Sequence, residues 1–313
     1  MTEILLSIFF ISVLLLFLST GVWVALSMIG VSTIAMTLFT SRPVGDAMAT
    51  TIWGTSSSWT LTALPLFVWM GEILFRTKLS ENLFEGLSPW MQKLPGGLIH
   101  VNVVGCALFA AISGSSAATV ATVGKMSIPE LRKRNYPEKI LLGSLAGSGT
   151  LGLLIPPSII LIIYGVTVQE SIAKLFVAGI IPGIMIALIF MGYVILWSLF
   201  NKKEMPNIIN QYSFIDKIKK SGQLIPVIIL IVSVIGSIYT GIATATEAAS
   251  LGVVGSLILS YFQNSLNWKT FKSSLLGATK TSCMISFILA GSAFLSLAMG
   301  FTGLPRNLAL WIN

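Results

Sequence analysis

The stretch AAISGSSAAT, residues 110–119, decides how the chain around it is expected to fold. It is a run of small and hydroxyl-bearing residues between two apolar arms, GLIHVNVVGCALF at 97–109 and AATVATVGKMSI at 117–128. As helices these arms would be about 18–22 Å long. A membrane-spanning helix needs about 20 apolar residues to cross roughly 30 Å of hydrocarbon, so neither arm crosses alone.

Charged residues flank the outer ends of both arms, Lys93 before the first and the run 130–134 after the second. This pattern predicts a re-entrant hairpin over 97–128 whose tip stops near the middle of the membrane. Irregular backbone at that depth is tolerated only inside protein or beside a water-filled cavity. The alternative is one spanning helix with a Gly/Ser patch for packing, since small residues are common where membrane helices touch.

Composition sets the class of protein. The chain has 313 residues, of which 55% are hydrophobic and 10% charged, and its mean hydropathy is +0.90. Apolar runs long enough to span a membrane recur along it, which predicts an all-α polytopic membrane protein. The two cysteines, Cys106 and Cys283, lie far apart in apolar segments, so we expect packing residues rather than a disulfide or a metal site.

The net charge of +8 is explained by where the basic residues lie. Sixteen of the 19 Lys and Arg residues fall in four inter-helix stretches: 76–93, 125–139, 202–220 and 269–280. Basic clusters on alternate loops indicate the cytoplasmic side of the membrane. We therefore expect a multi-pass protein surrounded by membrane lipid, with its N-terminus on the side opposite the cytoplasm, and no nucleic-acid partner.

A second interruption is predicted in the crossing at 139–167, whose centre reads GSGTLGLLIPPS at 147–158. Pro156 and Pro157 each remove a backbone donor and disfavour helix at the residue before them. The pattern predicts a broken helix with free carbonyls at about the depth of the hairpin tip. The alternative is a proline kink that matters only for packing.

The start of the chain and the part after residue 226 share a weak similarity at an offset of about 220 residues. The loop charges give the two copies opposite orientations, and inverted repeats with broken helices are typical of secondary transporters. We expect the second repeat to be incomplete in this chain. The expected divisions are helices of the first repeat at 1–58, a part with both interruptions at 59–200, a cytoplasmic linker at 201–222, helices of the second repeat at 223–280, and the start of a further part at 281–313.

The predicted tip offers the hydroxyls and carbonyls of Ser113, Gly114, Ser115 and Ser116. A ring of neutral oxygens can replace the hydration shell of a monovalent cation. The stretch holds no carboxylate of the kind that Ca²⁺ and Mg²⁺ prefer, so Na⁺ is the expected ion. Opposed helix N-termini would also attract a carboxylate substrate.

Four motifs carry a resemblance to a known family: ISGSSAATVATVG at 112–124, LRKRNYPE at 131–138, IPPSIILIIYGVTVQESIAKLFVAGIIPG at 155–183 and TATEAASLG at 244–252. Together the chain resembles the large membrane (M) subunit of tripartite ATP-independent periplasmic (TRAP) transporters. The family pattern usually reads TPTEAA, so Ala245 stands where proline is expected. The family's second hairpin has no counterpart in this chain.

The resemblance implies an inverted-repeat, elevator-type secondary transporter with re-entrant hairpins that imports an organic acid anion with sodium across a bacterial inner (cytoplasmic) membrane, with its N-terminus in the periplasm. It further implies that 1–58 and 223–280 are scaffold helices, that 59–200 is a transport domain and that 281–313 begins the second half of that domain. It implies two protein partners, a small four-helix membrane (Q) subunit and a periplasmic substrate-binding protein. The sodium ligands carried over are Ser113, Gly114, Ser115 and Ser116 at the tip with Gly149, Gly152, Ile155 and Pro156 at the break. The substrate contacts carried over are Ser115, Thr119, Pro157, Ser158 and Ser171. The motif of the second repeat, TATEAASLG, adds Thr244, Thr246 and Glu247 as candidate residues.

Other classes fit the residues less well. An intramembrane serine protease would pair Ser115 with the only histidine, His100, which lies 15 residues away near the other end of the first arm. We expect His100 to pack and Glu247 to cap a helix. No GxxxxGK[ST] motif is present, so direct ATP drive is excluded for this chain and we expect no enzyme. A cation channel and a carboxylate transporter without a binding protein stay open as alternatives, as does the identity of the acid.

Overall fold

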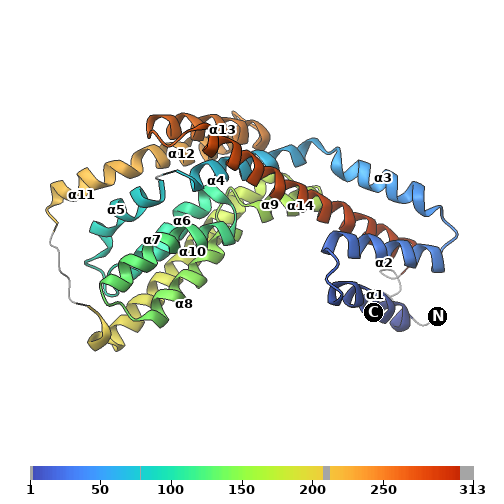
Figure 1. The fold of residues 1–313 in the computed structure, drawn as a ribbon, viewed down its shortest axis with the longest axis horizontal. Helices are drawn as coiled ribbons and strands as arrows, with labels where there is room; N and C mark the ends of the chain where they lie inside the picture. Colours follow the sequence, from blue (N-terminus) through green and yellow to red (C-terminus); the bar gives the residue numbers. More distant parts are fainter. Residues whose placement is uncertain (1–2, 78, 207–211, 304–313) are drawn as a thin grey trace. The chain divides into compact units, whose positions relative to one another are not determined.

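The structure is a computed structural model that describes residues 3–77, 79–206 and 212–303. These residues form helices and no strands (Figure 1). The α-helices are α1 Glu3–Ser19, α2 Val24–Phe39, α3 Val44–Ser56, α4 Ala63–Phe75, α5 Leu79–Met91, α6 Ile99–Ser113, α7 Ser116–Lys133, α8 Glu138–Gly149, α9 Ile159–Val168, α10 Ile172–Phe200, α11 Phe214–Ser221, α12 Ile225–Tyr239, α13 Ala245–Phe262 and α14 Trp268–Phe301. Short 3₁₀ helices are η1 Trp59–Thr62, η2 Thr150–Leu153, η3 Lys202–Glu204 and η4 Gly222–Leu224.

Several helices are long and apolar enough to cross a membrane. Among the described residues these are α10, the continuous segment Phe214–Tyr239 that joins α11 to α12, α13 and α14. Their outer surfaces remain apolar, with side chains such as Ile181 and Leu188 of α10 exposed. This confirms the prediction of an all-α polytopic membrane protein.

The chain divides into two compact units, residues 1–61 with 280–313 and residues 62–279. In the first unit, α1 packs against α2 through Phe10 and Val31, and Phe9 meets Phe39 edge-on at 5.1 Å between ring centroids. The second unit contains both predicted interruptions. The division of the chain into scaffold helices, linker and transport domain stays a prediction.

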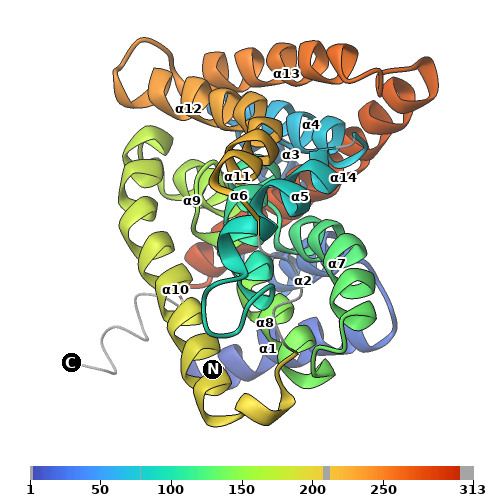
Figure 2. The same ribbon diagram turned by 90° about the vertical axis from the view of Figure 1, so that its left-hand side faces the viewer.

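In the second unit, α4 lies between α13 and the predicted hairpin (Figure 2). Gly252 of α13 sits against the Met70 side chain, and a Cβ there would be 2.5 Å from its sulfur. Trp69 on the same helix donates its indole N–H to Ser274 Oγ at 3.3 Å. These contacts fix α4, and α4 in turn supports the hairpin tip.

The structure corrects the prediction of an inter-helix stretch at 269–280. These residues form the first part of α14, which continues unbroken to Phe301. The reason is local packing: Trp268 and Phe271 stack with ring centroids 5.7 Å apart, and Trp69 meets Phe271 edge-on. Lysines at the end of a membrane helix can extend their ammonium groups into water, so the basic residues at 269–280 do not require a loop.

The predicted linker at 201–222 is also partly helical. Within it α11 packs against α5, where Trp90 donates to Ser221 Oγ at 2.6 Å and Lys217 Nζ lies 5.3 Å from the Trp90 ring centroid. Ser213 and Asp216 form a capping box that starts α11. The linker therefore contributes a wall to the second unit.

Candidate functional site

The residues around 110–119 form a turn between two antiparallel helices, α6 and α7 (Figure 1). A Cβ added at Gly105, nine residues before the turn, would lie 3.6 Å from Val123, nine residues after it. This pairing excludes the alternative of one straight helix through 97–128. That the hairpin enters the membrane from the cytoplasm stays a prediction.

The turn follows from a Gly-Ser pair. Gly114 has a φ of +58°, in the left-handed region that L side chains rarely adopt, and its N–H donates to Ala110 O at 3.0 Å to close α6. Ser115 is the N-cap of α7, and its Oγ accepts from Ala118 N at 3.4 Å. One residue thus ends the first helix and the next begins the second.

Three oxygens gather at the hairpin tip. Ser113 Oγ lies 2.9 Å from Thr119 Oγ1 and 3.3 Å from Ser115 O. The side chains of Ser113 and Thr119 are buried. Gly71 of α4 closes one side, because a Cβ there would be 2.9 Å from Ser113 Cα. The tip therefore presents neutral oxygens inside the protein.

The second interruption separates α8 from α9. After α8 and η2 the backbone is not helical between Leu154 and Ser158, and it includes the cis Pro156–Pro157 bond. Ser158 Oγ donates to Leu153 O at 2.8 Å, which accounts for one carbonyl freed by the break. The pattern of two prolines after a glycine-rich run thus predicted the position of the break.

The hairpin tip lies directly against this break. Ile159 N, the first N–H of α9, donates to Gly114 O at 3.2 Å. A Cβ at Gly152 would be 2.9 Å from Ser116 N, so the two backbones touch. We call this contact, made by residues 113–119 and 149–159, the junction.

Helix α10 covers the other side of the break. A Cβ at Gly179 would be 2.6 Å from Leu154 O, and one at Gly183 would be 2.8 Å from the Ile155 side chain. Sequence reasoning missed these two glycines and Gly71. Their signal is a glycine within a long apolar helix, but a single sequence does not say which neighbour such a glycine contacts.

One polar atom at the junction has no protein partner. The hydroxyl oxygen of Ser116 is buried and makes no hydrogen bond with any residue that the structure describes. The helix around it is held in place, since Gly149 sits directly against the Val120 side chain. A buried hydroxyl without a partner is costly unless a ligand or water satisfies it.

Not every predicted residue reaches the junction. Ser171 is the exposed N-cap of α10 and lies at the far end of α9, roughly 15 Å along that ten-residue helix from the break. Thr244 and Glu247 form the capping box of α13, where Thr244 N donates to Glu247 Oε2 at 2.8 Å, and Thr246 lies in its first turn. Glu247 thus caps a helix.

His100 packs away from the junction. It is fully buried, and its Nε2 donates to Pro95 O at 2.8 Å. It makes no hydrogen bond to Ser115, whose Oγ is engaged with Ala118 N. Within the described residues no group of three or more His, Cys, Asp or Glu side chains is arranged to hold a metal ion, and Cys106 and Cys283 are free thiols.

Apolar spanning helices around a helical hairpin docked on a broken helix define a polytopic membrane protein of the transporter class. The family model described as "Tripartite ATP-independent periplasmic transporter, DctM component" matches residues 11–313. The chain belongs to this family and corresponds to the large TRAP transporter subunit.

Curated relatives agree with this assignment. The chain is 31% identical over 268 residues to the C4-dicarboxylate TRAP transporter large permease of Pseudomonas aeruginosa, covering 85% of this chain and 62% of the relative. It is 31% identical to the isethionate TRAP transporter permease DctMQ of Oleidesulfovibrio alaskensis, covering 94% and 46%. It is also 31% identical to the 2,3-diketo-L-gulonate TRAP transporter large permease of Escherichia coli K12, covering 82% and 60%. The chain thus spans less than two thirds of the length of each of these relatives.

Proposed function

We propose that this chain forms part of a permease that imports an organic acid anion across a bacterial inner membrane together with sodium. A periplasmic binding protein delivers the substrate, a small membrane (Q) subunit completes the membrane complex, and the N-terminus faces the periplasm. Family membership and the permease names of the relatives support the transporter and its partners. We further propose that the unit that contains the junction moves across the membrane by an elevator mechanism.

The single observation that carries the sodium assignment is the junction itself. The hairpin turn meets the broken helix there, and the tip of the hairpin contains the buried oxygens of Ser113 and Thr119 and the hydroxyl of Ser116, which has no partner among the described residues. The residues of the junction include no carboxylate, which favours a monovalent over a divalent cation. Inward sodium flow provides roughly 2.3 kcal/mol per charge per 100 mV for accumulating the substrate.

Two helix N-termini also meet at the junction and favour an anionic substrate. Helix α7 begins at Ser116 and α9 at Ile159, directly after their N-caps Ser115 and Ser158. The N–H groups of a helix's first turn and its dipole attract a carboxylate. A sodium ion and a carboxylate bound side by side would also stabilise each other, which couples their transport.

A cation channel and a transporter that works without a binding protein are the competing functions. Uptake against a concentration gradient that depends on sodium separates a transporter from a channel. Uptake that requires the binding protein separates the remaining two. The permease names of the relatives favour the proposal over both.

The test replaces Ser115 with alanine. We expect Ser115→Ala to raise the sodium concentration for half-maximal uptake about tenfold, because it removes a tip hydroxyl and the N-cap bond to Ala118 worth about 1 kcal/mol. The measurement is sodium-dependent uptake in proteoliposomes, with membrane insertion checked by size-exclusion chromatography. Ser213→Ala, at the N-cap of α11 away from the junction, serves as the control. Unchanged sodium dependence in Ser115→Ala would remove this residue from the ion site.

A further inference from the structure

The second unit contains a cavity of about 780 Å³ that is separate from the junction. Its wall is formed by the C-terminal end of α4, by α5, by α7 and by the linker around α11. The lining residues are Phe75, Arg76, Thr77, Phe84, Glu85, Ser88, Thr122, Lys125, Met126, Glu130, Arg134, Tyr212 and Lys220. Binding sites for small molecules have volumes of about 300–1,000 Å³, so this space suits a small organic acid.

The charges in the wall are unequal. Four basic and two acidic side chains of the described residues line the cavity. Arg76 pairs with Glu72 at 2.9 Å, and Arg134 pairs with Glu130 at 3.5 Å. Within the described part of the chain, this leaves two lysines of the wall without ion pairs, opposed by one carboxylate, Glu85.

The two lysines without ion pairs come from different elements. Lys125 of α7 makes no hydrogen bond or ion pair with any described residue. Lys220 of α11 lies 3.5 Å from the Tyr212 hydroxyl and 4.5 Å from its ring centroid. Both ammonium groups therefore keep charge available for an anion in the cavity.

The cavity is connected to the junction by one face of α7. Positions 115, 119, 122 and 126 are spaced by four, three and four residues and so lie on the same side of the helix. Thr122 lines the cavity, and it lies one turn, about 4.5 Å, from Thr119 at the hairpin tip. A polar strip of Ser115, Thr119 and Thr122 thus joins the two sites.

We propose that this cavity binds a di- or tricarboxylate through Lys125 and Lys220 and forms a station for the substrate between the junction and the cytoplasm. The binding is a property of the cavity, whereas the role in transport rests on the proposed function. The two lysines attract an acid that has left the helix N-termini of the junction. The negative charge of Glu85 lowers the affinity of the cavity for this anion, so that the anion can be released.

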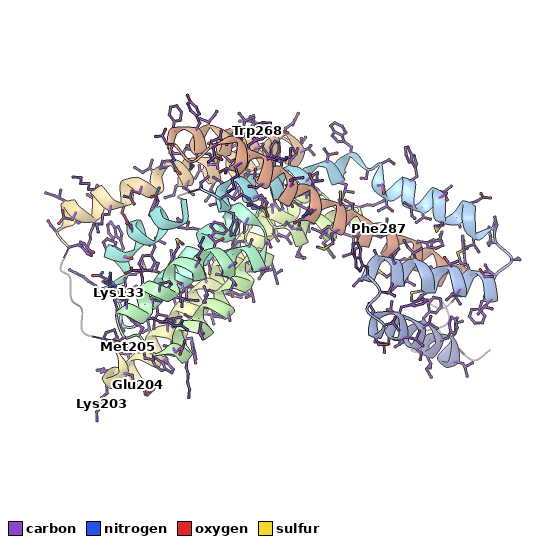
Figure 3. The ribbon with its side chains drawn as sticks, viewed as in Figure 1. Lys133, Lys203, Glu204, Met205, Trp268 and Phe287 are labelled. Carbon is purple, nitrogen blue, oxygen red and sulfur yellow. The ribbon has the colours of Figure 1, made fainter. Side chains whose placement is uncertain are left out.

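The test is a calorimetric titration of the purified chain with citrate as the probe, in phosphatidylcholine nanodiscs and without sodium. We expect saturable binding that weakens with added salt. Lys125→Gln is expected to weaken it about tenfold, because an anion loses one charge-assisted hydrogen bond. Lys125→Arg, which keeps the charge, is expected to restore binding. Lys133→Gln is the matched control, since Lys133 is exposed at the end of the same helix and does not line the cavity (Figure 3).

Equal citrate affinity in Lys125→Gln and wild type, or no saturable binding in wild type, would overturn the proposal. Inorganic phosphate in a competition arm tests the chemistry of the ligand. Displacement of citrate by phosphate at equal concentration would show a general anion patch and contradict the carboxylate assignment. Because the titration contains neither sodium nor a transport step, a failure of sodium coupling in the Ser115→Ala experiment would leave its outcome unaffected.

Discussion

Gly114→Ala is expected to abolish sodium-dependent uptake. The residue has a φ of +58°, which costs a non-glycine residue about 1–3 kcal/mol. Its new Cβ would also lie 2.8 Å from Pro157 O and 3.0 Å from Ile159 N, and both atoms are backbone. The tip must therefore move away from the break, which lengthens the bond from Ile159 N to Gly114 O. A loss of about 2 kcal/mol at the ion site would weaken sodium binding roughly thirtyfold.

Gly241→Ala separates backbone strain from loss of contact. Gly241 has a φ of +72°, but no atom of a described residue lies within 4 Å of the position its Cβ would take. This control carries a similar strain without a clash. Uptake should persist in Gly241→Ala and fail in Gly114→Ala. Similar uptake in the two variants would mean that the docking of the tip on the break does not matter for transport.

Gly152→Val is expected to have an effect of similar size from the opposite side of the junction. A Cβ at Gly152 would lie 2.9 Å from Ser116 N and 3.0 Å from Ser115 C, so the side chain has to push the hairpin backbone aside. We expect the sodium concentration for half-maximal uptake to rise by more than about tenfold, since overpacking costs about 1–3 kcal/mol.

The matched control is Gly143→Val, on the exposed side of α8, where nothing lies within 4 Å of the added Cβ. It shares the change of backbone propensity from glycine to valine but not the contact. Sodium-dependent uptake that falls equally in both variants would indicate a general effect of the substitution and not displacement of the hairpin.

The two interruptions could be predicted because their signals are local. Gly114 with Ser115 specifies a helix end followed by a helix start, and Pro156 with Pro157 removes two backbone donors in succession. Such chemistry acts within a few residues, so a single sequence contains it. The positions of the turn and the break therefore agree with the structure.

Contacts between helices that are distant in the chain could not be predicted from the sequence. Gly71, Gly179 and Gly183 close the junction from α4 and α10, but nothing in their neighbourhood distinguishes them from glycines at lipid-facing positions. Ser171 was carried over with the motif at 155–183, and the ten residues of α9 hold it away from the break. Two residues of one sequence motif can therefore lie far apart in space when a helix separates them.

The charge pattern predicts an orientation in the membrane, which stays a prediction, and it did not indicate the cavity. Lys125 and Lys220 belong to two of the four basic stretches whose pattern indicates the cytoplasmic side. They line one cavity because α11 folds back onto α5, held by the bond from Trp90 to Ser221. A lysine on a loop and a lysine in a binding site look alike until the fold brings them together.

Equilibrium binding of ²²Na⁺ to the purified protein tests most directly whether the hairpin tip and the broken helix form one ion site. Ser113→Ala removes a hydroxyl from the tip, and Gly152→Val places a side chain of the break against the backbone of the tip. We expect saturable binding in the wild type and a loss of sodium affinity of about tenfold or more in each variant. Wild-type affinity in both variants would contradict a shared sodium site at the junction.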